Sequence, residues 1–148
     1  MPSILIVAHT PLASSLQAVA RHAFAECGRQ LAAVDIPAEA DLDQAQALID
    51  AAMALLPQEE VLLLVDAFGA TPSNAALASA GARARGGTGV NVPMVWRPLC
   101  YGHLPLDELV TRAVDGARNG VMQVTSPRRQ NQPPNRLPSH DPESNSDQ

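Results

Sequence analysis

The chain has 148 residues, of which 46% are hydrophobic, 3% are aromatic and 17% are charged. This composition fits one domain with an aliphatic core. The formal net charge is −5 and all ten basic residues are arginine, which argues against a nucleic-acid or anionic membrane partner and excludes mechanisms that need a lysine.

Short apolar runs alternate with amphipathic segments along the first half of the chain. In chain order, these patterns predict a strand at Ile4–Ala8, a helix at Leu12–Cys27 stopped by Gly28, a strand at Leu31–Ile36, a helix from an Asp41 or Asp43 cap to Leu56, a strand at Val61–Val65 and a helix at Pro72–Ala84. The second half is less regular. It predicts a fourth strand within Gly86–Val92, a short helix at Pro93–Cys100, a helix at Leu106–Asn119 and a last strand at Val121–Thr125.

The segment 126–148 differs in composition from the rest. It holds five of the 13 prolines, many polar residues and a single large aliphatic side chain, Leu137. Such a segment buries too little apolar area to offset the entropy of ordering, so we expect a folded domain at 1–125 and a disordered tail. No apolar run approaches the roughly 20 residues of a membrane-spanning helix, and no secretory signal is evident. We therefore expect a cytoplasmic protein without direct membrane insertion.

Continuously apolar strands separated by helices are typical of a parallel sheet that is covered on both faces. The predicted fold is therefore α/β, with an open, doubly wound, mainly parallel four-stranded sheet and helices on both faces. The last strand would lie at an edge. In such sheets, ligands bind beyond the carboxyl ends of the strands, where the strand order reverses.

Two residues whose side chains could take part in a reaction follow strands of this predicted sheet. His9 comes directly after the first strand and Asp66 directly after the third. If these strands are neighbours, the two side chains face each other at the carboxyl edge. A carboxylate can bind one ring nitrogen of a histidine and leave the other free as a nucleophile.

The segment after Asp66 favours an anion at the same edge. Gly69 permits close approach of the backbone, Thr71 is a candidate N-cap with a free hydroxyl, and Pro72 suits a first helical turn. The N-terminus of a helix binds anions through its free N–H groups. Asn91 and Arg97, further along the chain, can approach this edge or serve the fold alone. Together these residues indicate phosphoryl transfer to and from His9.

Three blocks of the sequence carry a family resemblance. They are ILIVAHTPLASSL at 4–16, LLLVDAFGATPSNAA at 62–76 and GVNVPM at 89–94. Their order and spacing resemble the EIIA components of mannose/fructose/sorbose-type sugar phosphotransferase systems over about 125 residues. The chain departs from the commonest pattern at Thr10 and Ala70, where many members have glycine.

The resemblance implies a phosphocarrier that accepts phosphate from the protein HPr and passes it to an EIIB protein, here a separate chain, or acts as a regulatory relay. It implies His9 as the phosphoacceptor, Asp66 as its orienting and stabilising partner and Thr71 as a hydrogen-bond donor to phosphate. The remaining positions of the implied phosphate and partner site are Thr10, Phe68, Gly69, Ala70 and Asn91. No metal or organic cofactor is implied. Family members are homodimers whose last strand, here Val121–Thr125, crosses to the partner's sheet.

Three alternatives compete with this interpretation. A receiver domain phosphorylated on Asp66 would need paired acids after the first strand and a lysine, and the chain has neither. A nucleotide- or flavin-binding module would need a glycine-rich first loop, which His9-Thr10-Pro11 does not supply. An EIIA-like subunit of a dihydroxyacetone kinase shares the expected fold and a histidine after the first strand, but the block DAFGATPSN favours the mannose type.

Overall fold

A computed structural model of the chain describes residues 1–26 and 31–125. The first helix was predicted to reach Cys27, but it ends at Ala23, where Phe24 leaves the helical conformation with φ −133° and ψ 60°. Gly28 and the predicted disordered tail lie outside the described residues. The described part contains the strands β1 (Ser3–His9), β2 (Leu31–Ile36), β3 (Val61–Val65) and β4 (Ala84–Thr88), and the helices α1 (Leu12–Ala23), α2 (Leu42–Ala54), α3 (Thr71–Ala80), α4 (Val92–Cys100) and α5 (Leu106–Asn119).

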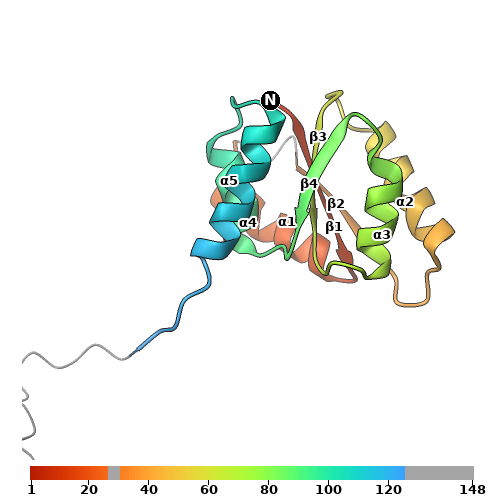
Figure 1. Ribbon diagram of the computed structural model, residues 1–148, viewed down its shortest axis with the longest axis horizontal. Coiled ribbons are helices and arrows are strands. Elements are labelled where there is room, and N and C mark those ends of the chain that lie inside the picture. The colour runs from red at the N-terminus through yellow and green to blue at the C-terminus, as the bar shows by residue number, and fades with distance from the viewer. Residues whose placement is uncertain (27–30, 126–148) are drawn as a thin grey trace, which may run out of the picture.

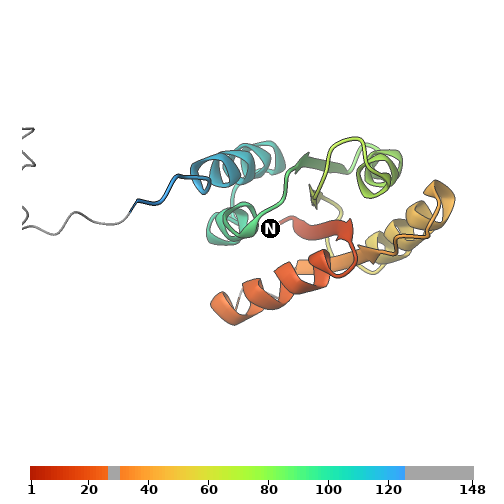
Figure 2. The same cartoon turned by 90° about the horizontal axis from the view of Figure 1, so that it is seen from below.

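The four strands form one parallel sheet in the order β2-β1-β3-β4. Figures 1 and 2 show α1, α4 and α5 on one face and α2 and α3 on the other. The predicted open, doubly wound α/β sheet is therefore confirmed. The strand order reverses between β1 and β3, so the carboxyl ends of these two neighbours form the switch point. Within residues 1–26 and 31–125, the helices are too short or too polar to cross a membrane.

The central strands are buried on both faces, which explains their unbroken apolar sequences. Ile4 and Ile6 of β1 pack into the core beneath α1, α4 and α5, whereas Leu5 and Val7 pack beneath α2 and α3. All four side chains are fully buried, and burying each stabilises the fold by about 1.5–3 kcal/mol. Two well-packed apolar cores, one on each face of the sheet, therefore hold the strand that ends at His9.

Several predicted boundaries differ from the structure. Helix α3 ends at Ala80 rather than Ala84, because Gly81 adopts a positive φ of 54° that ends the helix. Strand β4 begins at Ala84 rather than Gly86, and it ends at Thr88, before the left-handed Gly89. Asp41, not Asp43, caps α2, through a capping box with Gln44. Residues 121–125 form no strand in this single chain, and their exchange between two chains stays a prediction.

We predict that Gly86→Ala destabilises the fold by roughly 1–3 kcal/mol, because overpacking beside a rigid backbone forces the strands apart. A Cβ at Gly86 would lie 2.1 Å from the carbonyl oxygen of Leu63 in β3. The matched control is Gly87→Ala, whose Cβ would first meet the terminal methyl group of Met94, at 2.9 Å. The free energy of unfolding in urea measures both variants. Equal losses for the two would contradict the role of close strand approach at Gly86.

Candidate active site

The carboxyl edge of the sheet brings His9 and Asp66 into direct contact. His9 is the last residue of β1, and Asp66 follows the last residue of β3, the strand hydrogen-bonded to β1. His9 Nδ1 and Asp66 Oδ2 are 2.6 Å apart, and the backbone N–H of His9 donates to the same oxygen at 2.9 Å. The side chain of His9 is 50% exposed, whereas that of Asp66 is 12% exposed. The predicted juxtaposition of these two residues is confirmed.

The ionisation of the Asp66 carboxyl decides which nitrogen of the His9 ring donates a hydrogen bond. Burial raises the pKa of Asp66, but the hydrogen bonds from the backbone and ring of His9 and from the Ala67 N–H outweigh it and lower the pKa below its ordinary value. Ala67 donates to Asp66 Oδ1 at 2.7 Å. The carboxylate is therefore ionised at neutral pH and can only accept hydrogen bonds. The ring must therefore donate from Nδ1, and in the neutral ring the lone pair is then on Nε2.

The loop after Asp66 leads into the N-terminus of α3. Gly69 has a φ of 81°, a left-handed conformation that favours glycine, and its carbonyl oxygen accepts a hydrogen bond from the side-chain amide of Asn74 at 3.2 Å. Thr71 is not the N-cap that the sequence predicts. Ala70, with extended backbone angles, is the N-cap, and Thr71 is the first helical residue. Because Ala70 has no polar side chain, no side-chain group caps the first N–H groups of α3.

The other predicted site residues divide into two groups. Thr10 and Phe68 flank the His9–Asp66 pair in sequence and are exposed, Phe68 by 81%. Asn91 instead caps α4: its side-chain oxygen accepts from the Met94 N–H at 2.9 Å, and its amide donates to the Ala117 carbonyl at 3.1 Å. A direct contact between Asn91 and phosphate stays a prediction. Arg97 lies with Trp96 in a groove between α4 and the end of α5.

Two residues near the site escape sequence reasoning. Asn74 closes the loop at Gly69, and Asp35 of β2 accepts a hydrogen bond from the Ser14 N–H at 3.1 Å. No sequence pattern pairs Asn74 with Gly69 or Asp35 with Ser14. A weak signal exists for Asp35, since α1 begins at Pro11-Leu12 without a capping side chain of its own.

The arrangement can support nucleophilic chemistry at a half-exposed imidazole. Within residues 1–26 and 31–125, no group of three His, Cys, Asp or Glu side chains is placed to hold a metal ion. The start of α3, with Thr71 as its first residue and no side-chain cap, follows Asp66 in the chain, and its binding of an anion beside His9 stays a prediction.

Comparison with known proteins relates the chain to one family. Residues 3–110 match the family model EIIA-man, described as the PTS system fructose IIA component. No curated protein matches the sequence.

Solved structures share the fold. A mannose/sorbose-specific IIA subunit of the phosphotransferase system from Enterococcus faecalis is 24% identical, with 85% of this chain and 96% of that chain covered and a TM-score of 0.75. An EIIA component of the phosphotransferase system from Streptococcus agalactiae is 18% identical, with coverages of 83% and 97% and a TM-score of 0.69. A PTS IIA protein associated with the fucose utilization operon of Streptococcus pneumoniae is 21% identical, with coverages of 83% and 96% and a TM-score of 0.58.

The lowered pKa of Asp66 predicts a pH-dependent contribution to stability. A depressed carboxyl pKa stabilises the fold above the pKa of the unfolded chain, about 4, and this contribution is lost as pH falls through the lower folded pKa. Urea unfolding across this pH range should show that Asp66→Asn costs stability at neutral pH and progressively less below about pH 4. Asp50→Asn, on the exposed side of α2, is the matched control. A cost of Asp66→Asn that stays constant with pH would contradict the prediction.

Proposed function

Because the chain belongs to the EIIA-man family of PTS system fructose IIA components, we propose that it carries a phosphoryl group on Nε2 of His9 between two partner proteins. One observation supports the proposal above all: the 2.6 Å hydrogen bond between His9 Nδ1 and Asp66. It fixes the proton on Nδ1 and directs the lone pair to the other nitrogen. Membership of the family implies a role in phosphotransfer. We propose which residues carry out the transfer and which proteins give and receive the phosphoryl group.

The chemistry requires one bond to form as another breaks. The Nε2 lone pair of His9 attacks the phosphorus of a phosphohistidine on the donor, and the P–N bond of the donor breaks with its electron pair returning to the donor imidazole. His9 then carries a positive charge on its ring as well as the phosphoryl group. The ionised Asp66 stabilises that ring through Nδ1–H. Transfer to the acceptor is the same step in reverse.

The phosphoryl oxygens would be stabilised by the start of α3. We assign hydrogen bonds to the Thr71 hydroxyl and to N–H groups of the loop at Phe68, Gly69 and Ala70. This segment presents the positive end of the α3 dipole, and its groups are preorganised by the loop. Catalysis would then rest on positioning and electrostatics without a metal or organic cofactor.

The phosphoryl donor would be HPr and the acceptor an EIIB protein, with all three in the cytoplasm. Both partners must reach His9 at the open edge of the sheet. The exposed Phe68 and Thr10 beside it would contact them in turn. If no EIIB accepts the phosphoryl group, the phosphorylation state of His9 would itself be the regulatory output.

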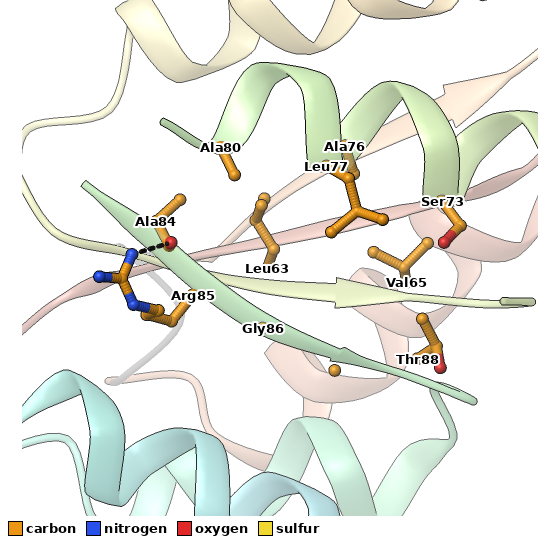
Figure 3. A pocket seen from close by; sticks show the side chains of 11 residues that line it. Leu63, Val65, Ser73, Ala76, Leu77, Ala80, Ala84, Arg85, Gly86 and Thr88 are labelled. Carbon is orange, nitrogen blue, oxygen red and sulfur yellow. Dashed lines mark hydrogen bonds between the residues drawn. The ribbon is translucent and has the colours of Figure 1, made fainter. Parts of the chain in front are cut away.

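We further infer that the protein is a homodimer in which Val121–Thr125 pairs with β4 of the partner. Strand β4 ends the sheet, so one of its backbone edges is unpaired. Beside it lies an open pocket of about 280 Å³ between β4 and α3, lined by Leu63, Val65, Leu77 and Ala80 among others (Figure 3). Val121, Met122 and Val124 expose 76%, 72% and 88% of their surface. These apolar side chains and that edge complement each other as in strand addition.

Replacing His9 should abolish phosphorylation. The protein is incubated with phosphoenolpyruvate, enzyme I and HPr, and intact mass and acid lability report the label. We expect one acid-labile phosphate on the wild type and none on His9→Ala. His22→Ala, on the exposed side of α1, is the matched control and should be labelled normally. A labelled His9→Ala would overturn the assignment.

Asp66→Asn should slow transfer roughly 10- to 100-fold, which is the effect of losing a charged hydrogen bond of about 1.5–3 kcal/mol.

The homodimer has its own test. Light scattering should report a dimer for the wild type and a monomer for Val124→Asp, because a buried carboxylate is incompatible with strand addition at an apolar groove. Val19→Asp, a similar change on the exposed side of α1, should remain dimeric. A monomeric wild type at micromolar concentration, or a dimeric Val124→Asp, would contradict the exchange.

A further inference from the structure

The short connection that follows His9 is held in place by the end of a neighbouring strand. The Thr10 N–H donates to the carbonyl oxygen of Ile36 at 3.1 Å, and the Ser14 N–H donates to Asp35 Oδ1 at 3.1 Å. Asp35 and Ile36 are the last two residues of β2. The chain from Thr10 to Ser14 is therefore attached to the sheet at both of its ends.

The contact with Asp35 replaces a cap that α1 lacks. The N-cap position is Pro11, whose side chain accepts no hydrogen bond, and the first turn contains no acidic residue. The hydroxyl groups of Ser14 and Ser15 donate to the Pro11 carbonyl, so they do not bind the free N–H groups of the helix. A carboxylate from β2 thus binds an N–H group at the positive end of α1.

Asp35 also lies close to His9 along the sheet. In the β1–β2 register it pairs with Ala8, one residue before His9. On the other side of His9 come the exposed Thr10, Pro11 and Leu12. These exposed residues adjoin His9, where a phosphoryl donor would approach the ring, and they belong to the segment that Asp35 and Ile36 attach to β2.

We propose that Asp35 is a positioning residue for phosphoryl transfer, which fixes the start of α1 and with it the donor-binding surface beside His9. The proposal rests on the proposed phosphotransfer to His9. Asp35 does not contact the ring in this arrangement, since Asp66 alone holds Nδ1. Its effect is on docking of the donor protein, not on the tautomer of His9.

The test is the initial rate of labelling at several concentrations of phospho-HPr. Asp35→Ala should lower kcat/KM by about three- to tenfold, mainly through a higher KM, because the donor meets a loosened surface. Asp35→Asn keeps an acceptor oxygen for the Ser14 N–H and should stay within about twofold of the wild type. Asp43→Ala, which removes an exposed carboxylate from the first turn of α2, is the matched charge control and should have no effect.

Two further measurements keep the test decisive. The nitrogen-15 shifts of the His9 ring should be the same in Asp35→Ala as in the wild type, whereas Asp66→Asn should change them. In the wild type, amide hydrogen exchange should be slower at Ser14 than at Leu12 and Ala13, because the Ser14 N–H donates to Asp35. This measurement needs no variant, so it does not depend on how stable the variants are. Equal kcat/KM for Asp35→Ala and wild type, an Asp35→Asn as slow as Asp35→Ala, or an unprotected Ser14 amide would overturn the proposal. An unlabelled wild type would instead overturn phosphotransfer itself.

Discussion

The contact between His9 and Asp66 depends on the adjacency of β1 and β3. These strands are not consecutive in the chain, yet parallel pairing places their carboxyl ends at one edge. The same pairing lets one carboxylate oxygen bind both the backbone N–H and the ring of His9. Ring position, ring orientation and tautomer are thereby set together. The aliphatic cores on the two faces of the sheet keep this edge rigid.

Most of the fold could be predicted because buried parallel strands have an unmistakable pattern. The runs ILIVA and VLLLV are apolar throughout, and the topology that they dictate also predicts the His9–Asp66 pair. Strand β4 was harder, since Ala84–Thr88 reads ARGGT and has no apolar pattern. Its place is set by the close approach of Gly86 to β3 and by the turn at Gly89, which depend on tertiary structure.

Details of the site were less predictable than its centre. A threonine before Pro72 favours an N-cap, but the helix begins one residue earlier and Ala70 takes that position. The sequence left open whether Asn91 serves the site or the fold, and the structure shows its side chain capping α4 and donating to the Ala117 carbonyl of α5. Asp35 serves α1 from another strand, so its spacing from Ser14 carries no local signal. Strand topology predicts which strand ends meet, but it does not predict individual side-chain contacts such as that of Asp35 with Ser14.

The position of the phosphorus on the imidazole ring tests the account most directly. Phosphorus-31 and nitrogen-15 spectra of the phosphorylated wild type distinguish the two ring nitrogens. We expect one phosphoryl group on Nε2 of His9, with the Nδ1 proton still hydrogen-bonded to Asp66. A phosphoryl group on Nδ1 would require the 2.6 Å contact to break and would contradict it, as would phosphorus on any other residue.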